Sequence, residues 1–141
     1  MTRIGSVQTA PATDVLNYDG KIYPDKFSGM RELRLSKPLG LNQFGVNQVT
    51  LQPGAWSSLR HWHEEEDEFI YVLDGVVTLV DNNGPHVLGA GDFAAFPAGE
   101  ANGHHLQNRS EQATRYLVVG SRRPGEETIH YPDETFGPVR T

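Results

Sequence analysis

Residues 61–75 read His-Trp-His-Glu-Glu-Glu-Asp-Glu-Phe-Ile-Tyr-Val-Leu-Asp-Gly, which places two imidazoles and a carboxylate beside a strand-like apolar run. Successive side chains of a β-strand alternate between its faces, so His61 and His63 are expected to point the same way. The run that begins at Glu68 is rich in β-branched and aromatic residues, which indicates a second strand. A hairpin that turns through residues 64–67 can therefore fold Glu68 back beside the two imidazoles.

A second polar cluster lies in residues 91–108, Gly-Asp-Phe-Ala-Ala-Phe-Pro-Ala-Gly-Glu-Ala-Asn-Gly-His-His-Leu-Gln-Asn. His104 and His105 are neighbours, so on a strand they face opposite sides and at most one can join the first cluster. His104 shares its face with Leu106 and Asn108, which suggests that it points into the barrel, and His105 stays as the alternative. Three imidazoles and one carboxylate can hold a single transition metal and leave positions open. The predicted ligands are His61, His63, Glu68 and His104.

Length and composition predict one compact domain with a small-molecule ligand. At 141 residues the chain is near the usual size of a single domain. Its formal net charge of -6 argues against a nucleic-acid partner, because phosphate backbones are met by basic surfaces. It has no cysteine, so any metal must be held by imidazole and carboxylate. No run approaches the ~20 apolar residues of a membrane span, and a cytoplasmic protein without a membrane partner is the expectation.

Short strand-like runs separated by turn residues predict an all-β fold, either a sandwich or a barrel. The predicted strands are Gly45–Leu51, Glu68–Leu73, Val76–Val80, His86–Leu88, Phe93–Phe96, His104–Asn108 and Arg115–Val119. We expect three segments: residues 1–40 as an N-terminal arm that packs on the barrel or on a partner subunit, residues 41–120 as the barrel, and residues 121–141 as a tail that packs on it.

The stretch from Gly54 to Asn108 resembles the cupin superfamily. The match consists of a glycine, His-x-His, a glutamate and a glycine, followed by Pro-x-Gly, a histidine and an asparagine. Four residues separate His63 from Glu68, and Gly91 is followed by five residues and then Pro97, as in the family pattern. The gap that leads to the last histidine is longer than usual, although the family spacing from histidine to asparagine selects His104.

The resemblance implies a double-stranded β-helix, also called a jelly-roll barrel, with one divalent transition metal: iron, manganese, nickel, zinc or cobalt. Beyond residue 38 the chain is similar to a group of small, single-domain bacterial cupins. Cupin sites support dioxygenation, decarboxylation, isomerisation and lyase reactions, so the resemblance implies a metal site without selecting the reaction. Small cupins usually pair, which implies a homodimer.

The resulting hypothesis is a metal-dependent enzyme that acts on a small, polar, oxygen-bearing substrate that chelates the metal. The sequence identifies no catalytic residue besides the ligands, although Tyr71, Tyr116 or His105 could serve if they face the cavity. The alternative hypothesis is a non-catalytic module that binds or senses a small ligand or the metal. A metal-free sugar-nucleotide isomerase is a third hypothesis, and the intact ligand set counts against it.

Overall fold

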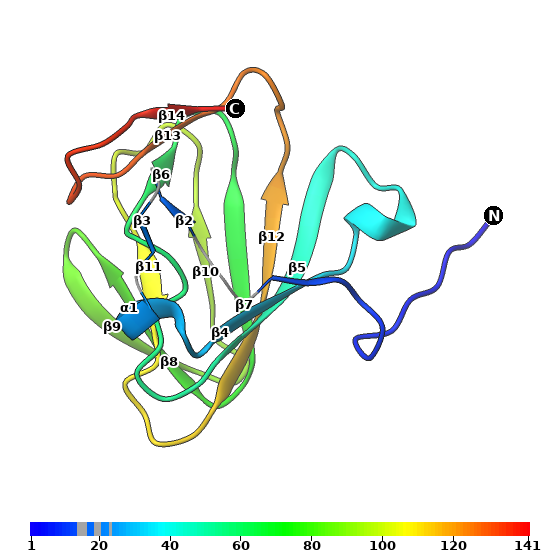
Figure 1. Cartoon of the computed structure of the whole chain (residues 1–141), viewed down its shortest axis with the longest axis horizontal. Coiled ribbons are helices and arrows are strands. Elements are labelled where there is room, and N and C mark those ends of the chain that lie inside the picture. Colours follow the sequence, from blue (N-terminus) through cyan, green and yellow to red (C-terminus); the bar gives the residue numbers. More distant parts are fainter. Residues whose placement is uncertain (14–16, 19–20, 23) are drawn as a thin grey trace.

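The computed structural model describes residues 1–13, 17–18, 21–22 and 24–141 (Figure 1). The predicted all-β fold is confirmed, because the helices are limited to α1 (Pro24–Phe27) and the single 3-10 turn η1 (Lys37–Leu39) within these residues. The strands are β1 Ala12–Thr13, β2 Asn17–Tyr18, β3 Lys21–Ile22, β4 Met30–Arg34, β5 Phe44–Leu51, β6 Trp62–His63, β7 Glu68–Asp74, β8 Val76–Asp81, β9 Gly84–Gly89, β10 Phe93–Phe96, β11 His105–Gln107, β12 Thr114–Ser121, β13 Thr128–His130 and β14 Val139–Arg140.

Two antiparallel sheets enclose the core. The larger has the order β1-β4-β5-β12-β7-β10, and the smaller has the order β11-β8-β9. The core cluster draws side chains from both sheets, which identifies the space between them as the barrel interior. These residues are Met30, Val49, Leu51, Ala55, Ile70, Val72, Val77, Leu79, Leu106 and Tyr116.

Strand β7 shows how the alternating pattern places a polar side chain inside the barrel. Ile70 and Val72 are buried, whereas Phe69 and Tyr71 on the opposite face are 36% and 40% exposed. Glu68 has the same parity as the two buried residues, so its carboxylate points inward at the end of the strand. The alternation of side chains along β7 therefore places both the core residues and the carboxylate of the predicted site on the inner face of the strand.

Two residues of the family pattern shape the barrel corners. Gly75, between β7 and β8, has a φ of 76°, and a Cβ there would lie 2.6 Å from the carbonyl oxygen of Ala113. Asn108 is 1% exposed, and its amide nitrogen donates to the carbonyls of Leu51 and Gln112. Its side-chain oxygen accepts from the backbone N–H of Ser110. Asn108 therefore joins a loop to the buried end of β5.

The predicted hairpin between the His-x-His segment and the Glu68 strand is wrong. Strand β6 pairs with β13 of the tail, and β7 belongs to the large sheet. The register sets His63 opposite Ile129 and Trp62 opposite His130. The acidic segment 64–67 carries the chain from the small β14-β13-β6 sheet to the large sheet, so it joins two sheets instead of closing one hairpin.

The N-terminal segment extends the large sheet and then leaves it. Strand β4 lies beside β5 and β1 lies beside β4, whereas the first ten residues run away from the barrel (Figure 1). Residues 14–16, 19–20 and 23 of the predicted arm lie outside the described residues. Among the described residues, no helix is long and apolar enough to cross a membrane.

Candidate metal centre

The predicted ligands come from separate elements that meet at one end of the barrel. His61 and His104 form an antiparallel bridge in which each backbone N–H donates to the other's carbonyl, at 3.1 and 3.0 Å. His63 lies on β6, and Glu68 begins β7. One ligand atom from each of His61, Glu68 and His104 lies within 4.8 Å of the others, so these three side chains could hold a metal ion. The ring of His63 lies 5.0 Å from that of His61.

Backbone carbonyls fix which nitrogen faces the centre in two of the histidines. Nδ1 of His61 lies 2.9 Å from the carbonyl oxygen of Leu59, and Nδ1 of His104 lies 3.1 Å from that of Asn102. Since a carbonyl can only accept, each Nδ1 must donate, and in a neutral ring Nε2 is then unprotonated. Nε2 of His104 lies 2.9 Å from Oε1 of Glu68. Two acceptors at this distance repel unless a proton or a metal ion stands between them.

His63 completes the set but is held differently. Its Nε2 lies 3.7 Å from Oε2 of Glu68, and its Nδ1 lies 3.6 Å from Oε2 of Glu127. Neither ring nitrogen has a hydrogen-bond partner within the described part of the chain. A buried imidazole with two unsatisfied nitrogens fits a residue that takes a ligand. Sequence reasoning missed Glu127, which lies in a tail without periodicity.

Electrostatics favour a charged Glu68 carboxylate and a neutral His61 ring. Burial alone would raise the pKa of Glu68, but its close contact with His104 and the positive charge that the neighbouring histidines carry when protonated lower it to about 2. Burial lowers the pKa of His61 to about 4, and the charge of Glu68 only partly opposes this shift. An ionised carboxylate facing unprotonated nitrogens is the donor set that divalent transition metals bind.

His105, the alternative ligand, points away from this cluster. Its Nδ1 donates to the carbonyl oxygen of Ser58 at 2.8 Å, and its Nε2 lies 2.9 Å from the side-chain nitrogen of Gln107. The edge of its ring packs on Trp56, with 4.6 Å between the ring centroids. Both ring nitrogens of His105 therefore contact Ser58 and Gln107 in the barrel wall and do not face the metal-ligand cluster.

The two tyrosines considered as proton carriers have other roles. Tyr71 lies on the outer face of β7, where its ring stacks with Phe93. Tyr116 is 1% exposed within the core cluster, and burial raises the pKa of its hydroxyl well above the usual range.

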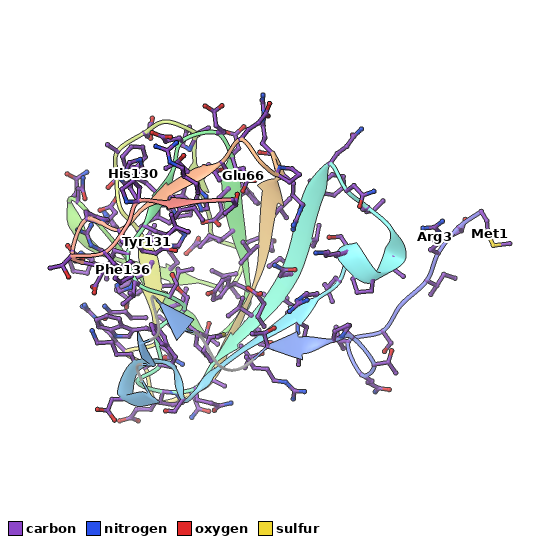
Figure 2. All side chains as sticks on the ribbon, turned by 45° about the horizontal axis from the view of Figure 1, so that its top comes forward. Met1, Arg3, Glu66, His130, Tyr131 and Phe136 are labelled. Carbon is purple, nitrogen blue, oxygen red and sulfur yellow. The ribbon has the colours of Figure 1, made fainter. Side chains whose placement is uncertain are left out.

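The tail covers the cluster from outside. The ring of Tyr131 lies 6.1 Å from that of His61 and 5.2 Å from that of Phe136, and Figure 2 shows both tail residues at this end of the barrel. Arg60 links the tail to the loop before His104, because its guanidinium donates to both carboxylate oxygens of Asp133 and to the carbonyl of Gly103. The tail therefore forms part of the wall around the site.

Little open space adjoins the imidazoles. A recess of about 20 Å³ is lined by His63, His104, Phe96 and neighbours in the 95–102 loop, and the ring of Phe96 stacks on His104 at 3.6 Å. A wider hollow of about 410 Å³, mostly apolar, reaches Glu68 from the side of β12. The recess holds about one water molecule, so a larger ligand in it would require residues 95–102 to move.

Comparison with known proteins defines the family. Residues 47–120 match the model of the cupin domain, and the chain belongs to the cupin family. No curated protein matches the chain.

Several solved structures of cupins resemble this chain in sequence and fold. The chain is 45% identical to a sugar phosphate isomerase of the cupin superfamily from Silicibacter pomeroyi, with a TM-score of 0.85, over 92% of this chain and 81% of that one. It is 30% identical to a putative sugar phosphate isomerase from Acidithiobacillus ferrooxidans, with a TM-score of 0.67, over 73% of this chain and 66% of that one. A polyketide cyclase from Streptomyces resistomycificus, 23% identical over 86% of this chain and 80% of that one with a TM-score of 0.69, shares the fold. These likenesses support the jelly-roll architecture implied by the sequence.

Proposed function

We propose that this chain is a metal-dependent enzyme that acts on a small, polar, oxygen-bearing substrate. His61, His63, Glu68 and His104 would hold one divalent transition metal. The observation that carries the proposal is the orientation of the imidazoles: Nε2 of His104 faces the Glu68 carboxylate at 2.9 Å while its Nδ1 is committed to a backbone carbonyl. A metal ion satisfies such a group of inward-facing acceptors.

The residues around the ligands would control water and orientation. A bound metal with open positions supplies a Lewis acid that polarises a substrate oxygen. Phe96 stacks on His104 and Tyr131 lies beside His61, so both would keep bulk water away from the ligands. The carbonyls of Leu59 and Asn102 would keep the two imidazoles in the ligating tautomer.

Sugar phosphates are the substrate class that we propose to test first. The structures from Silicibacter pomeroyi and Acidithiobacillus ferrooxidans are described as sugar phosphate isomerases, and the first is 45% identical to this chain. An open-chain sugar carries a carbonyl and a hydroxyl on neighbouring carbons, which suits chelation through two oxygens. Aldose–ketose isomerisation exchanges these two groups by moving hydrogen between the carbons and needs no external oxidant.

The experiment is a turnover assay on the metal-loaded protein in deuterated water. Protein loaded separately with each of the five metals is mixed with aldose and ketose phosphates, and NMR follows product and deuterium at the carbon next to the carbonyl. We expect turnover that disappears in His61→Ala. Metal binding without turnover on any sugar phosphate would reject this substrate class, and failure to bind any metal would reject the enzyme proposal.

The small recess favours a second candidate function, a non-catalytic module that senses or stores a metal. A space of about 20 Å³ beside His63 and His104 accommodates water but not a sugar phosphate. In this case calorimetry would show saturable metal binding, while every small-molecule titration and turnover assay would be negative. A substrate-dependent change in the spectrum of the bound metal would instead favour the enzyme.

We also propose that the protein is a homodimer formed through the outer face of the large sheet. Phe69, Tyr71 and Phe93 present stacked rings on this face and are 36%, 40% and 65% exposed. Leu117 and Val119 of β12 lie directly beside Tyr71 and Phe69 in the strand register. An exposed apolar sheet face that ends in the edge strand β10 is a surface that proteins normally cover.

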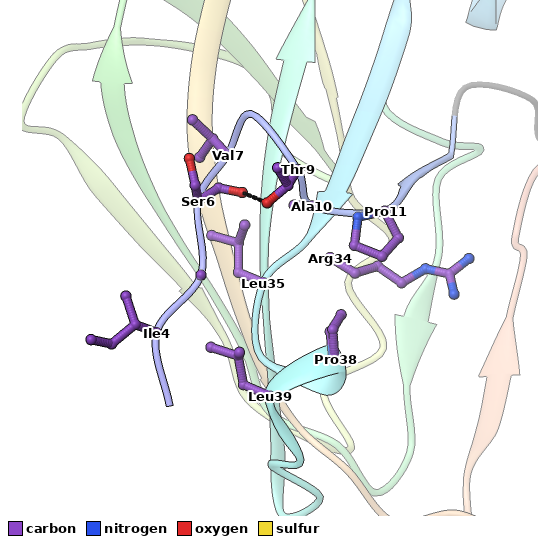
Figure 3. A pocket seen from close by; sticks show the side chains of 11 residues that line it. Ile4, Ser6, Val7, Thr9, Ala10, Pro11, Arg34, Leu35, Pro38 and Leu39 are labelled. Carbon is purple, nitrogen blue, oxygen red and sulfur yellow. Dashed lines mark hydrogen bonds between the residues drawn. The ribbon is translucent and has the colours of Figure 1, made fainter. Parts of the chain in front are cut away.

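The N-terminal arm supports a second copy as the occupant of this face. The arm runs away from its own barrel, with Ile4 and Val7 88% and 48% exposed. A groove of about 350 Å³ lies between the arm and residues including Leu35 and Leu39 (Figure 3). The exposed apolar side chains of the arm and the apolar face of the large sheet are two surfaces that a second copy can bury together.

Light scattering tests the dimer. The wild type should have twice the mass of the chain, and Phe93→Glu should give the monomer. Val87→Glu is the matched control, since Val87 on β9 is 72% exposed but lies outside the large sheet. A monomeric wild type would refute the proposal. The predicted cytoplasmic location and the predicted absence of nucleic-acid and membrane partners stay predictions from composition.

A further inference from the structure

Glu127 is a buried carboxylate that stands behind the proposed site. It precedes β13 in the tail and is 2% exposed. Its Oε1 accepts the backbone N–H groups of Glu64, Glu65 and Thr128 at 3.0, 3.2 and 2.9 Å. Three N–H donors on one oxygen hold the carboxylate in place.

The other oxygen of Glu127 has no hydrogen-bond partner among the described residues, and it faces His63. Oε2 lies 3.6 Å from Nδ1 of His63, which also lacks a partner in this part of the chain. A carboxylate oxygen that can accept and a ring nitrogen that can donate, both buried, therefore face each other just beyond hydrogen-bond distance. Their positions are set by the β6–β13 pairing, in which His63 lies opposite Ile129.

The other two histidines show what His63 requires. His61 and His104 each donate Nδ1–H to a backbone carbonyl, which leaves Nε2 unprotonated, and Nε2 of His104 faces Glu68. A histidine that binds metal through one nitrogen carries its proton on the other, and an outer acceptor fixes this arrangement. For His63 the acceptor that lies beside Nδ1 is the Glu127 carboxylate, whose Oε2 is 3.6 Å away.

We propose that Glu127 is a positioning residue that accepts Nδ1–H of His63 and thereby presents Nε2 of His63 to the metal. The inference rests on the proposed metal site and adds a residue from the tail to it. Glu127 would not touch the metal; its charge would strengthen His63 as a ligand and hold its ring in the ligating orientation.

A second metal ion is the competing interpretation, because His63, Glu66 and Glu127 also group closely enough to hold one. Two contacts argue against it. Oε2 of Glu66 already accepts the backbone N–H of Arg123 at 2.7 Å, and Oε1 of Glu127 is shared by three N–H donors. A metal on Nδ1 would also require His63 to lose both protons in order to bind metal on both sides. Figure 2 labels Glu66 at the same end of the barrel as the tail residues His130 and Tyr131.

Glu127→Gln reverses the polarity of the proposed contact without removing the side chain. The amide oxygen can accept the three backbone N–H groups, which turns the NH₂ group toward Nδ1 of His63. An amide donor there stabilises the tautomer protonated on Nε2, which cannot bind metal through that nitrogen. Glu66→Gln is the matched control, because it removes a neighbouring charge from the same cluster without facing Nδ1 of His63 in the proposed arrangement.

The first readout is the tautomer of His63 in metal-free protein, measured by nitrogen NMR above the ordinary imidazole pKa. We expect the proton on Nδ1 in the wild type and in Glu66→Gln, and on Nε2 in Glu127→Gln. A wild-type His63 protonated on Nε2 would overturn the proposal even if the variant failed to fold. This measurement does not depend on metal binding, so failure of the proposed function alone would leave its result standing.

The second readout is metal affinity and stoichiometry, with Co²⁺ as a spectroscopic probe. Glu127→Gln should weaken Co²⁺ binding about 10- to 100-fold and change its visible spectrum, whereas Glu66→Gln should match the wild type. Equal affinity in wild type and Glu127→Gln would overturn the proposal. Two metal ions per chain, with one lost in Glu66→Gln, would overturn it in favour of the second metal site.

Discussion

Replacing His104 or His105 by alanine should have opposite consequences, although the two histidines are adjacent and 4% and 3% exposed. His104 faces Glu68 at 2.9 Å, so His104→Ala should weaken metal binding by more than about 100-fold, which exceeds the 10- to 100-fold effect of a residue that only orients a ligand. His105 instead donates to the carbonyl of Ser58 and packs on Trp56, so His105→Ala should leave metal affinity within a few-fold of wild type.

The cost of His105→Ala falls on stability. Losing the donor leaves the partly buried Ser58 carbonyl without its partner, which costs about 1–3 kcal/mol, and the lost ring contact and cavity add about 1–2 kcal/mol. The sum, about 3 kcal/mol, corresponds to a fall in Tm of roughly 10 °C for a domain of this size. Since small domains have about 5–15 kcal/mol of stability, the variant should remain folded.

Two assays separate the histidines: competition with a chromophoric chelator for metal affinity, and thermal unfolding in excess chelator for stability. Wild type and both variants are compared in each. If His105→Ala abolished metal binding while His104→Ala preserved it, the assignment of the inward-facing histidine would be wrong. Equal losses of affinity in both variants would also contradict the reasoning, because only one of the rings faces Glu68.

Three further substitutions or conditions test the fold around the site. In chemical denaturation, Gly75→Ala should lower the unfolding free energy by about 2–4 kcal/mol, since φ is positive and the new Cβ would lie 2.6 Å from a backbone carbonyl oxygen. Gly84→Ala is the control: its φ is also positive but its Cβ would meet open space, so the loss should be only about 1–2 kcal/mol. Asn108→Ala should cost about 2–4 kcal/mol in the same assay, because two carbonyls lose their donor; a loss below 1 kcal/mol would show that water replaces the amide. Burial lowers the pKa of His105 to about 4, so the stability that its neutral ring gives the metal-free protein is complete above the unfolded pKa near 6.5. As the pH falls from 6.5 toward 4, up to about 3 kcal/mol of unfolding free energy is lost. His105→Gln should flatten this dependence of stability on pH, and an unchanged dependence would refute the burial of a neutral His105.

The strand pattern predicts much of the fold because period-2 alternation is a local property. Ile70 and Val72 identify the inner face of β7, and the same parity places Glu68 inside the barrel. The same argument, applied to two adjacent histidines, gives them opposite directions, and in the structure His104 faces Glu68 whereas His105 faces the carbonyl of Ser58. The predicted strand His104–Asn108 is shorter in the structure, since β11 covers only His105–Gln107 and His104 joins through a single bridge to His61.

Long-range pairing accounts for what sequence reasoning missed. The predicted hairpin from His63 to Glu68 fails because β6 pairs with β13, more than sixty residues further along the chain. That pairing also brings Glu127 to His63 from a tail of turn residues, where local patterns contain no signal of a functional carboxylate. The role of Glu127 can be recognised only when the folded structure shows the three backbone N–H groups that donate to its carboxylate.

The most direct test of the proposed centre is a crystal structure of the metal-loaded protein with anomalous diffraction data recorded at the absorption edge of the bound metal. The account predicts one anomalous peak per chain, within about 2.0–2.3 Å of nitrogen atoms of His61, His63 and His104 and an oxygen of Glu68. A peak between His63, Glu66 and Glu127 instead, or no peak in protein soaked with each of the five candidate metals, would contradict it.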